Sequence, residues 1–186
     1  MLLSSNRVDH RLMSNGLIRV RYLLFCFLLV GCTGTPQGVV PVDNFDLQRY
    51  LGRWYEIARL DHSFERGLEA VTADYTMRED GGVRVINTGR SIETGAVKQA
   101  EGRAYFVQGP NQGHLKVSFF GPFFGSYIVF ELDAQDYQYA FVAGNNRNYL
   151  WLLARTPQVP DSLIEHFESQ VAALGFDIQQ LIYVAH

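Results

Sequence analysis

The residues most able to do chemistry in this sequence are its histidines, and one of them stands between an acid and an alcohol. Asp61, His62 and Ser63 supply the three side-chain types of a nucleophilic triad. Neighbours in sequence do not form the geometry of a triad, however, and no glycine-x-serine-x-glycine turn accompanies them. We therefore expect His62 to be a solvated loop histidine, and we predict no catalytic residue and no enzymatic activity.

The other patterns typical of catalytic or cofactor sites are also missing from the sequence. His114 falls in an expected strand, His166 on the flank of an expected helix, and His186 at the end of the chain. No histidine or cysteine cluster has the spacing of a zinc site, and no glycine-rich phosphate loop precedes a helix. The sequence predicts neither a metal nor a cofactor.

The strongest chemical signal lies at Cys32. Arg19 and Arg21 precede the uncharged run Tyr22–Val30, which is about half of the ~20 residues that a spanning helix needs. Charged residues before a short apolar run are typical of a cleaved signal peptide. The residues Leu29 to Cys32 resemble the lipobox of bacterial lipoproteins, which implies cleavage before Cys32 and acylation of that cysteine. A buried thiol, or a disulfide with Cys26, explains fewer of these features.

This interpretation divides the chain into residues 1–31 as the signal peptide, 32–44 as a lipidated tether and 45–186 as the folded domain. A start at Met13 would give a signal of ordinary length. Thr33, in place of the aspartate that retains lipoproteins in the inner membrane, implies by the same resemblance an anchor in the outer membrane, facing the periplasm. Two or more acyl chains make such anchoring stable.

Composition indicates one acidic domain rich in β-strands. The chain of 186 residues is 47% hydrophobic and 13% aromatic, which fits a single domain with a substantial core. Without residues 1–31, twelve basic and eighteen acidic side chains remain. A body of that charge lacks the basic surface that nucleic-acid binding requires, so we exclude a nucleic-acid partner.

Short aromatic and β-branched segments separated by turn signals predict eight antiparallel strands in up-and-down order, closed into an all-β barrel. We expect them at residues 52–59, 71–78, 83–90, 98–107, 114–120, 126–132, 137–143 and 149–155. Asp80, Gly81 and Gly82 mark one hairpin. A helix follows, with a capping-box pattern at Ser162 and Glu165 and an apolar stripe from Leu163 to Leu174. A short last strand, at about 178–184, would pair with an open edge of the barrel.

The segment NFDLQRYLGRWYEIAR at residues 44–59 contains the Gly-x-Trp of Gly52 and Trp54, and it resembles the first strand of the lipocalins. FERGLEAVTADY at 64–75, KVSFFGPFFGSY at 116–127 and YLWLLARTP at 149–157 extend the resemblance to the bacterial lipocalins, near the apolipoprotein D branch. It implies that Arg155 packs across Trp54 and closes a barrel floor, a structural role for Gly52, Trp54 and Arg155. The family's Thr-Asp-Tyr corner survives only loosely, at Asp133 and Tyr137.

Strand alternation places Glu56 and Ala58 on the inner face with Trp54, and Leu153, Trp151 and Tyr149 on the same face as Arg155. The resemblance extends this register to the whole barrel. The predicted ligand-binding residues are Ala58, Tyr75, Val85, Asn87, Phe119, Tyr127, Val129, Val142, Tyr149 and Trp151. Glu56, a buried carboxyl group that needs a partner, is a weaker candidate.

The resemblance implies a lipid-binding protein that stores or transports a fatty acid or a lysophospholipid in the cell envelope. The alternatives are a lipid-modifying lipocalin enzyme and an envelope scaffold with a filled barrel. Phe119–Gly125 holds four phenylalanines at an expected strand connection. A homodimer interface, a membrane surface, the cavity mouth or the barrel itself could cover them.

Overall fold

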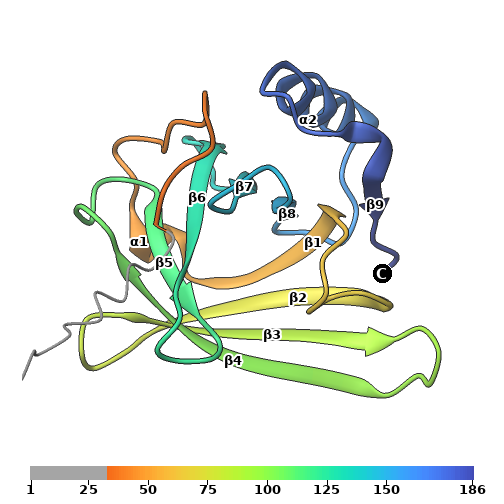
Figure 1. The fold of residues 1–186 in the computed structure, drawn as a ribbon, viewed down its shortest axis with the longest axis horizontal. Coiled ribbons are helices and arrows are strands. Elements are labelled where there is room, and N and C mark those ends of the chain that lie inside the picture. The colour runs from red at the N-terminus through yellow and green to blue at the C-terminus, as the bar shows by residue number, and fades with distance from the viewer. Residues whose placement is uncertain (1–32) are drawn as a thin grey trace, which may run out of the picture.

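The computed structural model describes residues 33–186, in which eight antiparallel strands close into a barrel (Figure 1). The strands are β1 (Gly52–Leu60), β2 (Leu68–Met77), β3 (Val83–Ser91), β4 (Val97–Phe106), β5 (His114–Ser118), β6 (Gly125–Leu132), β7 (Tyr139–Ala143) and β8 (Leu150–Ala154). Each strand pairs with the next, and β1 closes the ring by pairing with both β2 and β8. This confirms the predicted fold. Residues 1–31, Met13 and Cys32 lie outside the described residues.

The up-and-down order gives the barrel two different ends. The floor end carries the β2–β3, β4–β5 and β6–β7 connections, at residues 78–82, 107–113 and 133–138. The mouth end carries the β1–β2, β3–β4, β5–β6 and β7–β8 connections, at residues 61–67, 92–96, 119–124 and 144–149. The predicted hairpin at Asp80 lies at the floor end, where Gly81 adopts a positive φ of 80° that glycine tolerates without strain.

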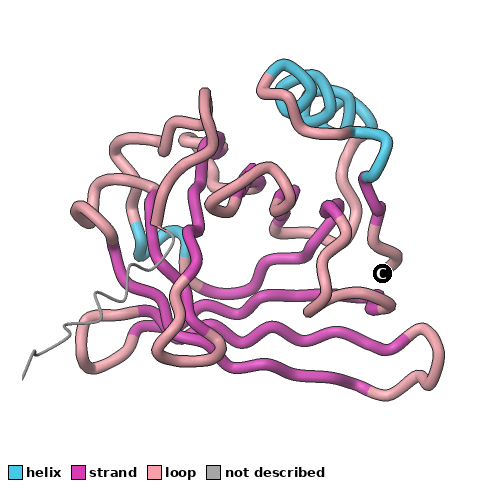
Figure 2. Tube along the Cα trace, in the orientation of Figure 1, coloured by secondary structure: helices cyan, strands magenta, loops and turns pink. Residues whose placement is uncertain are grey.

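The β3–β4 hairpin is longer than its neighbours on one side. The antiparallel register of β3 and β4 runs from Val83–Ala104 to Arg90–Val97, whereas β5 pairs only with Arg103–Phe106. Figure 2 shows this hairpin reaching past the ends of β5 and β6. The barrel rim is therefore uneven.

A β-bulge in the middle of β1 changes which side chains face inward. Glu56 pairs with Leu153, but Ala58, two residues on, pairs with the adjacent Leu152, so the register shifts by one residue. A bulge inverts the alternation beyond it. Arg59 therefore points inward and Ala58 outward, and the prediction that Ala58 faces the cavity is wrong.

Outside the barrel, a second core forms between the sheet and α2 (Asp161–Ala173), which Figure 1 shows beside the barrel wall. Phe167 and Val171 are the buried residues of α2, and Ala58 belongs to the same cluster. The helix begins after Pro160, whose N-cap position makes no side-chain hydrogen bond. The predicted capping box at Ser162 is thus wrong, because Ser162 lies inside the first turn.

After α2, a 3₁₀ turn, η1 (Ile178–Gln180), leads into β9 (Leu181–Tyr183). β9 pairs with Ala58–Leu60, the part of β1 beyond its contact with β2. The predicted last strand is present, though shorter than expected. Within residues 33–186, none of the helices is long and apolar enough to cross a membrane.

The segment that precedes the barrel, predicted as an extended tether, packs along it. Gly34 O accepts a hydrogen bond from Ser126 Oγ at 2.8 Å, and Val42 bonds through its backbone to Gly113 and Val129. The short helix α1 (Leu47–Tyr50), which sequence reasoning did not anticipate, then lies before β1 with Asp46 as its N-cap. Residues 34–45 therefore run from the mouth end, where β6 begins, toward the floor end.

Candidate functional site: a cavity inside the barrel

Trp54 and Arg155 hold the floor of the barrel. The Arg155 guanidinium carbon lies 3.9 Å from the centroid of the fully buried Trp54 ring, the cation–π pair that the resemblance implies. Arg155 also donates hydrogen bonds to the carbonyl oxygens of Arg49, Arg53 and Tyr137, at 2.6, 2.8 and 3.3 Å. Gly52 has a φ of 92°, and a Cβ there would lie 3.5 Å from Arg155 Nη1. One guanidinium thus joins α1, β1 and the β6–β7 connection.

Above this floor the barrel encloses a cavity of about 650 Å³ that opens at the mouth end. Its volume lies within the ~300–1,000 Å³ typical of small-molecule sites. Seven of the predicted ligand-binding residues line it: Tyr75, Val85, Asn87, Phe119, Tyr127, Tyr149 and Trp151. Val129 and Val142 face inward but are packed in the inner core and do not line the cavity. Ala58 lies in the outer core, for the reason given above.

Three linked tyrosines cross the lower part of the cavity. Tyr127 Oη lies 2.6 Å from Tyr50 Oη and 2.9 Å from Tyr75 Oη, so the hydroxyl groups satisfy one another. Burial raises the pKa of all three phenols. They present neutral, amphipathic rings to a ligand.

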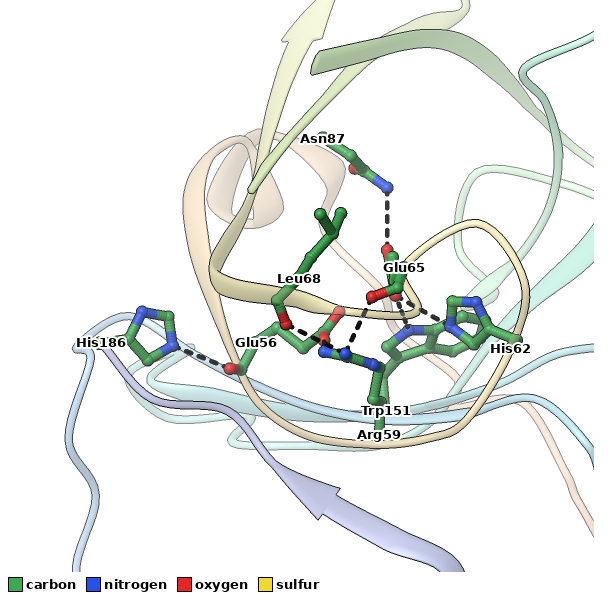
Figure 3. Close-up of polar contacts among 8 residues, drawn as sticks. All are labelled: Glu56, Arg59, His62, Glu65, Leu68, Asn87, Trp151 and His186. Carbon is green, nitrogen blue, oxygen red and sulfur yellow. Dashed lines mark hydrogen bonds and ion pairs between the residues drawn. The ribbon is translucent and has the colours of Figure 1, made fainter. Parts of the chain in front are cut away.

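A cluster of four ionisable side chains borders the upper cavity, beneath the β1–β2 connection (Figure 3). Glu56, Arg59, His62 and Glu65 are all buried, and Glu56 and Glu65 line the cavity. Arg59 Nη1 lies 2.5 Å from Glu56 Oε1, and Arg59 Nη2 donates to the carbonyl oxygens of Glu65 and Leu68, at 3.0 and 3.2 Å. Arg59 thus fixes the loop that carries Glu65 to the barrel wall.

Glu65 is the centre of the other half of the cluster. Its Oε2 accepts from the Trp151 indole at 3.1 Å and lies at ion-pair distance, 2.9 Å, from His62 Nε2. Asn87 Nδ2 reaches Glu65 Oε1 at 3.5 Å, while Asn87 Oδ1 has no hydrogen-bond partner. Figure 3 shows these side chains converging from β3, β8 and the loop. The prediction that His62 is solvated is wrong, because its ring is buried. The centroid of the ring lies 4.6–5.9 Å from the ring centroids of Phe64, Trp151 and Tyr149.

The two carboxyl groups of the cluster have opposite protonation tendencies. Burial raises the pKa of Glu56, and the nearby Glu65 adds to this, against the opposing effect of Arg59. Burial also disfavours ionisation of Glu65, but contacts with His62 and hydrogen bonds from Glu56 and Trp151 outweigh it and lower its pKa. Glu65 therefore carries the charge and Glu56 holds a proton more readily, so the cluster places few uncompensated charges in an apolar cavity.

Sequence reasoning missed Arg59 and Glu65, and no signal in the sequence identifies the bulge that turns Arg59 inward.

The remaining histidines are dispersed. His114 is buried in β5, where desolvation lowers its pKa, His166 contacts Glu131, and His186 Nε2 lies 2.9 Å from the Glu56 carbonyl oxygen. Among residues 33–186, no group of three acidic, histidine or cysteine side chains could hold a metal ion.

A closed antiparallel barrel with a packed floor, an open mouth and an apolar cavity defines a calyx-type binding protein. The family model of the Lipocalin-like domain matches residues 45–186, and the chain belongs to the lipocalins. It is 56% identical over 168 residues to the outer membrane lipoprotein Blc of Vibrio cholerae, across 90% of this chain and 98% of that protein.

Other similar proteins extend the comparison. The Escherichia coli K12 outer membrane lipoprotein Blc is 51% identical over 160 residues, covering 85% of this chain and 90% of its own. Mouse apolipoprotein D is 29% identical over 179 residues, covering 87% and 93% of the two chains. Insecticyanin from the tobacco hornworm Manduca sexta superposes with a TM-score of 0.65 at 21% identity, over 82% of this chain and 87% of that one. This last likeness establishes the fold alone.

Proposed function

We propose that this lipocalin binds a single-chain lipid, a fatty acid or a lysophospholipid, and carries or stores it in the cell envelope without changing it chemically. The observation that carries the proposal is the apolar cavity of about 650 Å³ above a sealed floor. Burial of one methylene is worth about 0.8 kcal/mol, so a fourteen-carbon tail offers about 11 kcal/mol against an association cost of about 4–15 kcal/mol. At the low end of that cost about 7 kcal/mol remains, which corresponds to micromolar binding without any ionic contact.

We further propose that acylated Cys32 anchors the protein in the outer membrane, with the barrel in the periplasm. The lipobox at residues 29–32 supports this proposal. The similar proteins from V. cholerae and E. coli are named as outer membrane lipoproteins. A lipid carrier attached to a membrane stays close to its source of ligand.

A titration tests the proposal against its alternatives. The mature protein, stripped of lipid, is titrated with a fluorescent fatty acid and a fluorescent lysophospholipid, and the ligand is recovered afterwards for mass spectrometry. Saturable one-to-one binding with intact ligand is expected. Recovery of a cleaved or modified ligand would instead indicate a lipid-modifying enzyme. No binding of either probe, with the emission of Trp151 unchanged, would indicate a scaffold and refute the carrier.

The homodimer through Phe119–Gly125 stays a prediction. The structure supports access to this loop, because Phe120 and Phe123 are exposed. Sedimentation of the delipidated protein across a concentration series tests it, and a monomer at all concentrations would contradict it.

A further inference from the structure

The mouth of the cavity is edged by aromatic side chains that stay largely exposed within residues 33–186. Phe64 in the β1–β2 connection is 61% exposed, and Phe120 and Phe123 in the β5–β6 connection are 76% and 71% exposed. All three also line the cavity. We call these three residues the rim phenylalanines. Exposed phenylalanines gathered at the entrance of an apolar cavity indicate a surface that contacts an apolar partner.

Basic side chains accompany the β5–β6 connection. Lys116 Nζ lies 5.3 Å and the Arg103 guanidinium carbon 5.8 Å from the centroid of the Phe124 ring. The sequence has only two lysines, Lys116 and Lys98, and Lys98 lines the cavity. In an otherwise acidic body, positive charge is thus placed beside the apolar rim. This combination is complementary to a bilayer, whose apolar interior lies below a surface that is often anionic.

The path of the chain brings the anchor to the same end. Gly34 O accepts a hydrogen bond from Ser126 Oγ, and Ser126 is the second residue of β6, next to the β5–β6 connection. Cys32 precedes Gly34 by two residues, and two residues span at most about 7 Å. The anchor proposed above is therefore attached two residues before a part of the chain that lies at the mouth end.

We propose that the mouth end docks on the membrane surface, with the rim phenylalanines inserted into the headgroup and acyl boundary, so that the cavity opens directly onto the leaflet. The anchor rests on the function proposed above, whereas the rim and its charges are independent of it. An amphipathic surface of this kind enters the boundary by about 5–10 Å. A lipid then passes from the leaflet into the barrel without crossing bulk water.

Site-specific labelling tests the orientation. A cysteine is introduced as Phe123→Cys at the rim, or as Glu79→Cys in the exposed β2–β3 turn at the floor end, and labelled with an environment-sensitive fluorophore. The mature lipoprotein is reconstituted in phosphatidylethanolamine and phosphatidylglycerol vesicles that contain brominated lipid. The rim label should lose emission at least about twofold, since at this depth it lies near the brominated chains. The floor label should not change.

Matched variants separate the rim from the anchor. Phe120→Glu, added to the rim-labelled protein, should reduce the quenching of the rim label to nearly that of the floor label. The control is Met77→Glu, at an exposed apolar residue near the floor end. It should leave the quenching of the rim label unaltered. Equal quenching at both positions, or none at the rim, would overturn the docking. A rim label shielded from aqueous iodide but not quenched by brominated lipid would show that a second copy covers it, and this also overturns the proposal.

The parent chain without an introduced cysteine tests the anchor separately. If the parent takes up label, Cys32 is a free thiol and the proposed acylation fails. In that case the docking is read by adding the same vesicles to the soluble rim-labelled chain, with Cys32 replaced by serine. Quenching there supports the docking without the anchor, and its absence refutes the docking.

Discussion

Arg59 is the side chain whose removal should most disturb the barrel interior. Its guanidinium is 2% exposed, pairs with Glu56 at 2.5 Å and donates to two loop carbonyl oxygens. The variant Arg59→Leu keeps only a short apolar side chain at this position and leaves the Glu56 carboxyl group without its cation. Breaking a buried ion pair by removing one partner costs about 3–5 kcal/mol, and we expect this loss in the free energy of unfolding at neutral pH.

The assays are urea unfolding and thermal melting of the mature chain, each followed by tryptophan fluorescence and circular dichroism. For a chain of about this length, a loss of about 1 kcal/mol in the free energy of unfolding lowers the melting temperature by about 2–4 °C. The melting temperature of Arg59→Leu should therefore fall by about 6–20 °C. The control is Arg84→Leu, which removes an exposed arginine from its pair with Glu101. A surface pair of this kind contributes about 0–1 kcal/mol. A loss for Arg59→Leu no larger than that of the control would refute the reasoning.

The same variant has a pH dependence whose sign follows from Glu56. Burial raises the pKa of Glu56 in the folded protein, and Arg59 opposes the rise. A raised folded pKa gives stability that is fully present below the unfolded value of about 4.3 and is lost as the pH rises through the folded pKa. Without Arg59 the pKa of Glu56 rises further, so the deficit of Arg59→Leu should grow from pH 5 to pH 8. A deficit that is constant over this range would contradict the assignment.

Three further predictions test the floor, the cavity and the bulge. Arg155→Lys should lower the free energy of unfolding by about 1–3 kcal/mol in thermal melts, because lysine cannot reproduce the guanidinium hydrogen bonds and its stacking on Trp54; wild-type stability would contradict this. Trp151→Ala and Tyr75→Ala should each weaken binding of a fluorescent fatty acid by about tenfold or more with the fold intact by circular dichroism, and unaltered affinity in both would refute the inner-face register. Ala58→Leu should cost about 1–3 kcal/mol by overpacking the outer core without changing lipid affinity, so a loss of affinity in the folded variant would contradict the outward position of Ala58.

The strands, their order and the floor could be predicted from the sequence, because each depends on local signals. Alternation, glycine-marked turns and the Gly52 and Trp54 motif are all visible in short windows. Seven cavity-lining residues could be predicted from the alternation of side chains along a strand. Trp54 and Arg155 fixed which face of their strands points inward, and the family resemblance extended this assignment to the other strands of the barrel. In a regular strand, the alternation of side chains alone predicts which residues face the cavity.

The errors arise where tertiary contacts overrule local pattern. A single bulge between Glu56 and Ala58 reverses the inward and outward faces of the last part of β1, and nothing in its composition marks it. His62 looked solvated because its neighbours are polar, yet the loop folds over the cavity and buries it. Val129 and Val142 have the predicted orientation, but packing with the rest of the inner core leaves no space beside them. Depth within a barrel is not encoded in strand alternation.

The path of residues 34–44 gives the molecule a mechanical property. This segment is bound at the mouth end through Gly34 and Ser126, and farther on through Gln37 to Arg147 and through Val42 to β6. Under a pull from the membrane, these bonds would open one after another, while the eight-stranded ring, which does not include the segment, stays closed. Eleven peeled residues extend by up to about 36–40 Å. The protein thus holds a length of tether against its own surface, where Val39 packs in the outer core and Val42 against the inner core.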